Sequence, residues 1–134
     1  MIKENPISRT KIKKMKFNIT RHCRDRYIER VLANSGKCDN LFITMLSDLK
    51  TGENITSKIS ENLPRFVLYL KERYGKDKGY TIIKKDYTFF ILTKRKGTED
   101  LYDVITCYIE YDTFRRFSKT ILSKDQIHLK LALL

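Results

Sequence analysis

The 134-residue chain is 41% hydrophobic and 33% charged, which fits one globular domain and argues against disorder throughout. Its 28 lysines and arginines exceed its 16 aspartates and glutamates, and the formal net charge of +12 favours polyanionic partners such as RNA, although a basic surface can also serve solubility alone. No stretch reaches the ~18 apolar residues of a membrane span, and residues 1–16 lack the apolar segment of a secretory signal, so no membrane association is expected.

The cysteines are Cys23, Cys38 and Cys107, an odd set without the CxxC spacing of metal or redox sites. Such usage is typical of a reducing compartment, so the expected location is cytoplasmic. Cys23 and Cys107 fall within apolar patterns and are expected to be small core residues. Because no spacing of His and Cys supports a zinc site, the sequence predicts neither a metal nor another cofactor.

The chain is predicted to open with a basic arm. Residues 1–15 show little periodicity and carry several lysines, so they form either an arm that contacts phosphates or an ordinary frayed terminus. Residues 16–134 are expected to form a single α+β domain. A short strand at 16–19 leads into a helix whose N-cap is Asn18 or Thr20.

Helical periodicity dominates as far as residue 75. The first helix should end near 34–36, where Asn-Ser-Gly is a suitable C-terminal signal. A second helix is predicted at about 39–50, followed by a turn at 51–54. The third helix begins near Ser60 or Asn62, because a proline two to four residues later is tolerated in its first turn.

Beyond residue 79 the hydrophobic period becomes strand-like. Three runs rich in Ile, Tyr, Phe, Thr and Val predict an antiparallel meander whose third strand is central. They lie at 80–84, 87–94 and 101–109. Residues 110–113 should close the third strand, and 114–122 continue as a further strand or a short helix. The apolar tail at 127–134 is expected to dock on the domain.

The predicted fold class is α+β, with N-terminal helices packed on a C-terminal antiparallel β-meander. Side chains alternate between the two faces of a strand. One face of the third strand is therefore expected to carry Val104, Thr106 and Tyr108, and the other Ile105, Cys107 and Ile109.

The first helix carries the pattern with the clearest chemistry. His22, Arg26, Glu29 and Arg30 recur at helical spacing and share a polar stripe about 80° wide at 3.6 residues per turn. A histidine near a helix N-terminus can transfer protons close to neutral pH, and two arginines can hold phosphate oxygens. These are the groups that cleavage of a phosphodiester needs. The alternative is an ordinary solvated face, where ion pairs at i,i+4 contribute only ~0.3–0.5 kcal/mol each.

Further cations near the strands are candidates for binding a nucleic-acid backbone. With Arg30 of the first helix, they are Lys84, Lys94, Arg95, Lys96, Arg115 and Arg116. Tyr87 or Tyr102, if exposed, is suited to stack on an unpaired base. Lysines at turns also keep sheet edges from pairing, so this pattern is less specific than the helical stripe.

Two segments resemble a known grouping of proteins. Residues 19–31, which begin Ile-Thr-Arg-His-Cys-Arg-Asp-Arg, resemble the opening helix of small toxin- and phage-encoded proteins with the pattern Ile-Thr-x-His-Ala-x-x-Arg. Residues 87–93, followed by 103–108 with Val-Ile-Thr-Cys-Tyr, resemble their closing strands. Those proteins belong to the RelE/barnase/EndoU/colicin-like grouping of metal-independent ribonucleases. Here Cys23 replaces the usual alanine, and two extra helical segments separate the matching pieces.

The resemblance implies a helical layer on a curved antiparallel sheet that presents the catalytic groups. By position it implies His22 as an acid or base, Arg26 and Arg30 as phosphate ligands, and Thr106 as a strand residue that hydrogen-bonds substrate. A β-branched strand former is the alternative role of Thr106.

These observations predict a metal-independent endoribonuclease that cleaves RNA by attack of the 2′-hydroxyl, in the manner of a toxin or phage effector. An acidic antitoxin or host protein is an expected partner besides RNA. The alternative is a noncatalytic basic module that binds nucleic acid or an acidic host protein. A small phage structural protein also fits the composition, but it leaves the stripe around His22 unexplained.

Overall fold

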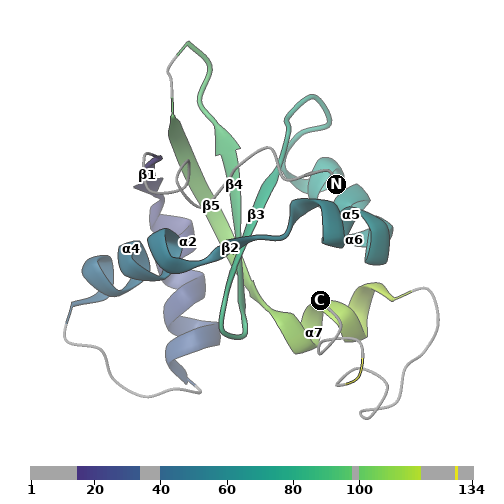
Figure 1. Ribbon diagram of the computed structural model, residues 1–134, viewed down its shortest axis with the longest axis horizontal. Coiled ribbons are helices and arrows are strands. Elements are labelled where there is room, and N and C mark those ends of the chain that lie inside the picture. Colours follow the sequence, from purple (N-terminus) through teal and green to yellow (C-terminus); the bar gives the residue numbers. More distant parts are fainter. Residues whose placement is uncertain (1–14, 34–39, 98–99, 119–128, 130–134) are drawn as a thin grey trace, which may run out of the picture.

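A mixed five-stranded sheet separates two layers of helices (Figure 1). The computed structural model describes residues 15–33, 40–97, 100–118 and 129. The strands lie in the order β1-β5-β4-β3-β2. In chain order they are β1 (Lys16–Ile19), β2 (Glu53–Asn54), β3 (Thr81–Lys85), β4 (Thr88–Lys94) and β5 (Leu101–Ile109). The helices are α2 (Arg21–Tyr27), a π-helix η1 (Ile28–Leu32), α4 (Leu41–Thr51), α5 (Thr56–Asn62), α6 (Pro64–Tyr74) and α7 (Glu110–Phe117).

The antiparallel meander is confirmed, and the α+β class with it. Strands β3, β4 and β5 pair consecutively in antiparallel fashion, and β5 has a strand on each side. The expectation of a purely antiparallel sheet is wrong, because β1 pairs with β5 in parallel, with Ile19 opposite Val104. A four-residue strand carries no signal for direction, since either direction buries the same alternate side chains. The expected layout is also incomplete, because α7 follows the meander.

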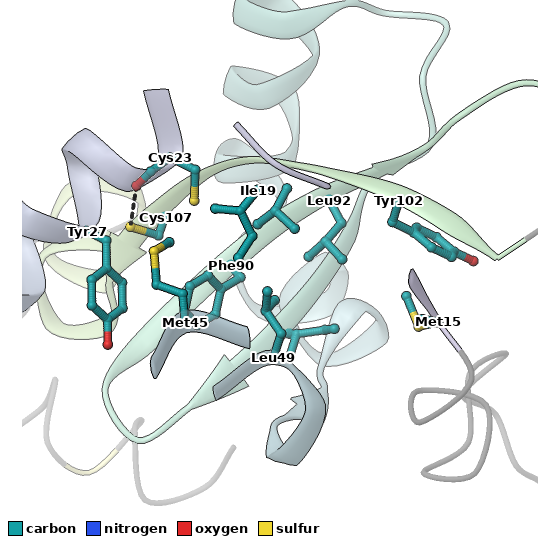
Figure 2. Close-up of a cluster of buried hydrophobic side chains, with 12 residues drawn as sticks. Met15, Ile19, Cys23, Tyr27, Met45, Leu49, Phe90, Leu92, Tyr102 and Cys107 are labelled. Carbon is teal, nitrogen blue, oxygen red and sulfur yellow. Dashed lines mark hydrogen bonds between the residues drawn. The ribbon is translucent and has the colours of Figure 1, made fainter. Parts of the chain in front are cut away.

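Each face of the sheet is covered by its own helices (Figure 1). On one face α2 and α4 bury Cys23, Tyr27 and Met45 against Phe90 of β4, as Figure 2 shows. On the other face α5, α6 and α7 enclose a second core, whose largest side chains are Phe66, Phe89 and Phe114. Strand β4 is therefore buried on both faces, which explains its continuous run of apolar residues.

A register shift in β5 overturns the predicted assignment of its faces. Ile91 pairs with Thr106, but the next residue of β4 pairs with Val104, so Ile105 has no partner opposite it. An extra residue of this kind is a β-bulge, and alternation of side chains restarts beyond it. Val104 consequently packs in the α2 and α4 core together with Cys107, whereas Tyr108 packs in the opposite core.

Several predicted boundaries in the helical half need correction. The segment expected to be only a turn at 51–54 contains β2, which pairs with β3. Helix α5 was not predicted, because its seven residues are largely polar. The third predicted helix is α6, which starts with Pro64 in the first turn. Residues 110–113, expected to close the strand, form the first turn of α7 instead.

Both chain ends extend beyond what the structure describes. Met15, the last residue of the predicted basic arm, is 2% exposed and belongs to the α2 and α4 core. The rest of that arm, 1–14, lies outside the described residues. The tail at 127–134, which was predicted to dock on the domain, also lies outside the described residues, apart from Leu129. The side chain of Leu129 is 65% exposed.

Thr20 is the residue that fixes where α2 begins. Its side-chain oxygen accepts a hydrogen bond from the Cys23 amide at 3.1 Å, which confirms one of the two predicted N-caps. The same hydroxyl donates to the Val104 carbonyl of β5 at 2.9 Å. One side chain thus caps α2 and ties the helix to β5.

Replacing Thr20 with valine should lower the free energy of unfolding by about 1 kcal/mol, because it removes the cap. The Val104 carbonyl keeps the hydrogen bond that the backbone amide of residue 20 donates at 3.2 Å. Denaturant unfolding measures this change. Thr51→Val is the matched control, since Thr51 is exposed and its hydroxyl bonds only within α4, to Ser47. Equal effects of the two substitutions would contradict the role assigned to Thr20.

Candidate functional site

The polar stripe of the first helix is present as predicted, but it crosses from α2 into the π-helix η1. His22 and Arg26 lie on α2, and Arg30 lies in η1; all three are partly exposed. Arg26 Nη1 donates to both carboxylate oxygens of Glu29 at 2.7 Å. Glu29 and Arg26 therefore form an ion pair that is largely open to solvent.

Arg30 is anchored to the sheet by two contacts. Strand β1 ends opposite Val104, so the edge of β5 beyond that residue has no neighbouring strand. Arg30 Nη1 donates to the Cys107 carbonyl on this edge at 2.6 Å. Its guanidinium carbon also lies 4.9 Å from the centroid of the Tyr108 ring. These contacts satisfy a strand edge and hold the guanidinium in a fixed position.

A second helix brings further groups to the same place. Tyr74, at the end of α6, has its hydroxyl 3.5 Å from the hydroxyl of Tyr108. Arg73 lies beside it, with its guanidinium carbon 5.8 Å from the centroid of the Tyr74 ring. Arg73 is exposed and close enough to His22 to affect its pKa. We call His22, Arg26, Arg30, Arg73 and Tyr108 the α2–α6 site.

The charges around His22 are mainly positive. Partial burial lowers the pKa of His22 below its ordinary value of 6.5, and the positive charges of Arg26, Arg30 and Arg73 lower it further. Asp25 acts in the opposite direction but has the smallest effect. The imidazole is therefore neutral at pH 7 and able to accept a proton, in a field that attracts anions.

Thr106 lies beneath the surface. It is 1% exposed, and its hydroxyl is buried without a hydrogen-bond partner among the described residues. A substrate on the surface does not reach this hydroxyl, so the structure favours the packing role of Thr106 over the predicted contact with substrate. Of the three residues predicted to be catalytic, the structure brings together His22 and Arg26.

Five of the remaining predicted cations lie at opposite ends of β5. Lys94 is exposed at the end of β4, and Lys96 is exposed in the connection to β5, where Arg95 forms an ion pair with Asp103. Arg115 and Arg116 are exposed on α7, which follows β5. Arg116 stacks on Tyr69 with its guanidinium carbon 4.8 Å from the ring centroid. Only the α7 end lies near Arg30, because Arg30 and Arg116 line a common pocket of 160 Å³.

Lys84 has a partner within the protein. Its Nζ lies 2.7 Å from Oε2 of Glu110, a side chain that is 2% exposed. The ammonium of Lys84 is thus engaged in neutralising a buried carboxylate, and its predicted contact with phosphate would require breaking this pair.

Burial of Glu110 makes stability depend on pH. Desolvation raises the pKa of Glu110 above its ordinary 4.5, although Lys84 opposes the shift. A raised folded-state pKa stabilises the fold fully below pH 4.5, and this contribution is lost as the pH rises through the folded-state pKa. Glu110→Gln does not titrate, so its stability relative to wild type should increase as the pH rises from 4.5. Unfolding measured from pH 3 to 7 checks this, with the exposed Glu61→Gln as control; parallel profiles for wild type and Glu110→Gln would refute it.

A pocket of 490 Å³ lies between η1, α4 and the β3–β4 turn, and Arg30 lines it as well. Within the described residues no three His, Cys, Asp or Glu side chains are grouped to hold a metal ion. None of the helices in the described ranges has the length and apolarity needed to cross a bilayer.

Sequence reasoning identified the α2 half of the α2–α6 site and missed the α6 half. Arg73 and Tyr74 end an amphipathic helix, and nothing in their local pattern links them to His22, about 50 residues earlier. Only the packing of both helices against β5 brings them together. Comparison with known proteins finds no match, whether among protein-family models, curated proteins or solved structures.

Proposed function

We propose that the protein is an endoribonuclease that binds RNA at the α2–α6 site and cleaves it without a metal ion. The observation that carries the proposal is the convergence of one imidazole with guanidinium groups from two separate helices. Arg30 and Tyr74 both contact Tyr108, and Arg73 lies over Tyr74, so guanidinium groups of two helices meet beside one ring. Burial lowers the pKa of His22, and the charges of these arginines lower it further. A neutral base beside fixed positive charge suits attack on a phosphodiester, where negative charge accumulates in the transition state.

In the proposed reaction, His22 removes the proton from a ribose 2′-hydroxyl. The 2′-oxygen forms a bond to the adjacent phosphorus as the bond from phosphorus to the 5′-oxygen breaks. Water protonates the departing 5′-oxygen, and His22 later returns its proton to solvent. The products are a 2′,3′-cyclic phosphate and a free 5′-hydroxyl, so atoms and charge balance without a further reactant.

The arginines have separate tasks in this proposal. Arg30 is held by Cys107 and Tyr108, so its guanidinium is positioned before substrate binds. Arg73 is exposed at the end of α6 and its charge acts on His22, which suits it to hold a nonbridging oxygen of the phosphate. Arg26 is engaged with Glu29 and contributes mainly positive potential.

A noncatalytic RNA-binding module is the second candidate. The observation that favours it is the burial of Thr106, which removes from the surface one of the groups assigned to catalysis. Such a module would bind RNA with the same cations and leave the strand intact. An acidic protein partner would use the same charged surface.

Incubation of the purified protein with mixed RNA in EDTA tests the proposal. We expect cleavage that persists in EDTA and yields 3′ ends carrying 2′,3′-cyclic phosphate, identified by mass spectrometry. DNA of the same sequence lacks the 2′-hydroxyl and should remain intact. RNA that is bound but not cleaved would reject the nuclease in favour of the binding module, and loss of cleavage in EDTA would reject the metal-independent reaction.

A further inference from the structure

The 490 Å³ pocket beside Arg30 has features of a site for a flat polar ring. It is formed by η1, α4 and the turn between β3 and β4. Its lining combines the aromatic side chains of Tyr27 and Tyr87 with the carboxylates of Asp48 and Asp86. Binding sites for small molecules typically have this composition, with apolar walls and a few placed polar groups.

The two carboxylates give the pocket hydrogen-bond acceptors. Asp48 is half-buried on α4, and its Oδ2 accepts a hydrogen bond from the hydroxyl of Tyr27 at 2.8 Å. Asp86 stands at the β3–β4 turn with φ of 53°, and its charge reaches Asp48. Burial and, to a smaller extent, the charge of Asp86 raise the pKa of Asp48. A ligand that donates hydrogen bonds here would stabilise these neighbouring acceptors.

Tyr87 gives the pocket an exposed stacking surface. The side chain is 74% exposed, although aromatic rings of this size are usually covered. Strand β3 ends at Lys85 and β4 begins at Thr88, so the turn that carries Tyr87 is tight and firmly attached to the sheet. An aromatic ring held out from a rigid turn suits stacking on an unpaired base.

Arg30 connects this pocket to the α2–α6 site. It lines the pocket with Asp48 and Tyr87, and it also stacks on Tyr108 within the α2–α6 site. A nucleotide whose phosphate lies against Arg30 can therefore extend its base towards Tyr87. His22 lies eight residues away, about 12 Å at 1.5 Å per residue, so the base belongs to a nucleotide next to the bond being cleaved.

Resting on the proposed function, we propose that this pocket binds a guanine base of the RNA substrate. Guanine presents an imino and an amino donor side by side, which matches a pocket with two nearby carboxylates. Adenine and cytosine present one amino group, and uracil presents one imino group. A metal ion is a weaker fit, because Lys85 and Arg30 also line the pocket and no third acidic ligand joins the two aspartates among the described residues.

Binding of the four ribonucleoside 3′-monophosphates tests the proposal without requiring cleavage. Titrations of ¹⁵N-labelled protein should move the amide signals of Asp48, Asp86 and Tyr87, and guanosine 3′-monophosphate should bind at least about tenfold more tightly than the others, the discrimination expected of a good bidentate contact. Asp48→Asn should abolish this preference while retaining an acceptor for Tyr27. Tyr87→Ala should weaken all four nucleotides by about tenfold, since stacking does not depend on the base.

Controls separate the pocket from general effects of charge and folding. Asp77→Asn replaces an exposed aspartate in the α6–β3 connection and should leave the guanine preference unchanged. Equal affinities for the four nucleotides, or signal changes confined to other surfaces, would overturn the proposal. Signal changes at Asp48 and Asp86 on adding Mg²⁺, with none on adding nucleotide, would replace it with a cation site.

The outcomes also distinguish this inference from the proposed function. Guanine binding in a protein that leaves RNA intact would retain the pocket and reject the nuclease. Cleavage of RNA with no preference for guanine, unaffected by Asp48→Asn and Tyr87→Ala, would retain the nuclease and reject the pocket.

Discussion

His22→Ala should reduce the rate of RNA cleavage by roughly 10²–10⁴-fold, because it removes the group that accepts the proton of the 2′-hydroxyl. The affinity for RNA should change less than about twofold, since the substitution removes a neutral side chain and leaves every arginine in place. Cleavage rates under single-turnover conditions measure the loss of activity. Filter binding to an RNA made uncleavable by 2′-deoxy sugars measures the affinity.

His128→Ala is the matched control for His22, as it replaces the only other histidine of the sequence. It should leave both quantities unchanged. If His22→Ala weakened binding and cleavage in parallel, His22 would be a binding or structural residue and the proposed role would fail. If cleavage continued unchanged, another group would have to serve as the base.

Arg73→Ala should lower kcat by roughly 10²–10³-fold, the loss typical of removing one donor to a developing negative charge. Arg73 is exposed, so the free energy of unfolding should change by less than about 0.5 kcal/mol. The pKa of His22 should rise, because one of the cations that lower it is gone. A base is inactive when protonated, so the acidic limb of the pH–rate profile should move to higher pH.

NMR titration of the His22 imidazole gives the pKa independently of activity. Arg65→Ala is the matched control, because Arg65 is exposed near the start of the same helix. It should alter neither the pKa of His22 nor kcat. An unchanged pKa in Arg73→Ala would show that Arg73 does not face His22, and equal losses of kcat in the two variants would indicate a general effect of charge.

The meander and the caps could be predicted because their signals are local. Strands β3, β4 and β5 lie within one residue of the predicted runs, since β-branched and aromatic residues fill them. The first helix was predicted because apolar and polar stripes recur at helical spacing, and its cap was narrowed to Asn18 or Thr20, of which Thr20 is the one observed. Each of these features depends on residues that are close in the sequence.

The features that were missed depend on distant residues. Helix α5 is short and mostly polar, so its sequence gives little signal. Strand β2 has only two residues, and its pairing depends on β3 lying beside it. The bulge at Ile105 depends on register with β4, and it moves Val104 to the other face. Arg73 joins His22 only because α2 and α6 pack near β5. Partners of this kind are set by tertiary contacts rather than by propensity.

The parallel pairing of β1 with β5 limits the order in which the nascent chain can fold. The hydroxyl of Thr20 bonds to a carbonyl 84 residues later, so this contact between the first helix and the sheet cannot form until the first half of β5 has been translated. Contacts so distant in sequence slow folding. At about 5–20 residues per second, a nascent chain carries His22 for several seconds before Cys107 and Tyr108 exist to position Arg30. A translation product that stops before Cys107 therefore lacks both groups that position Arg30.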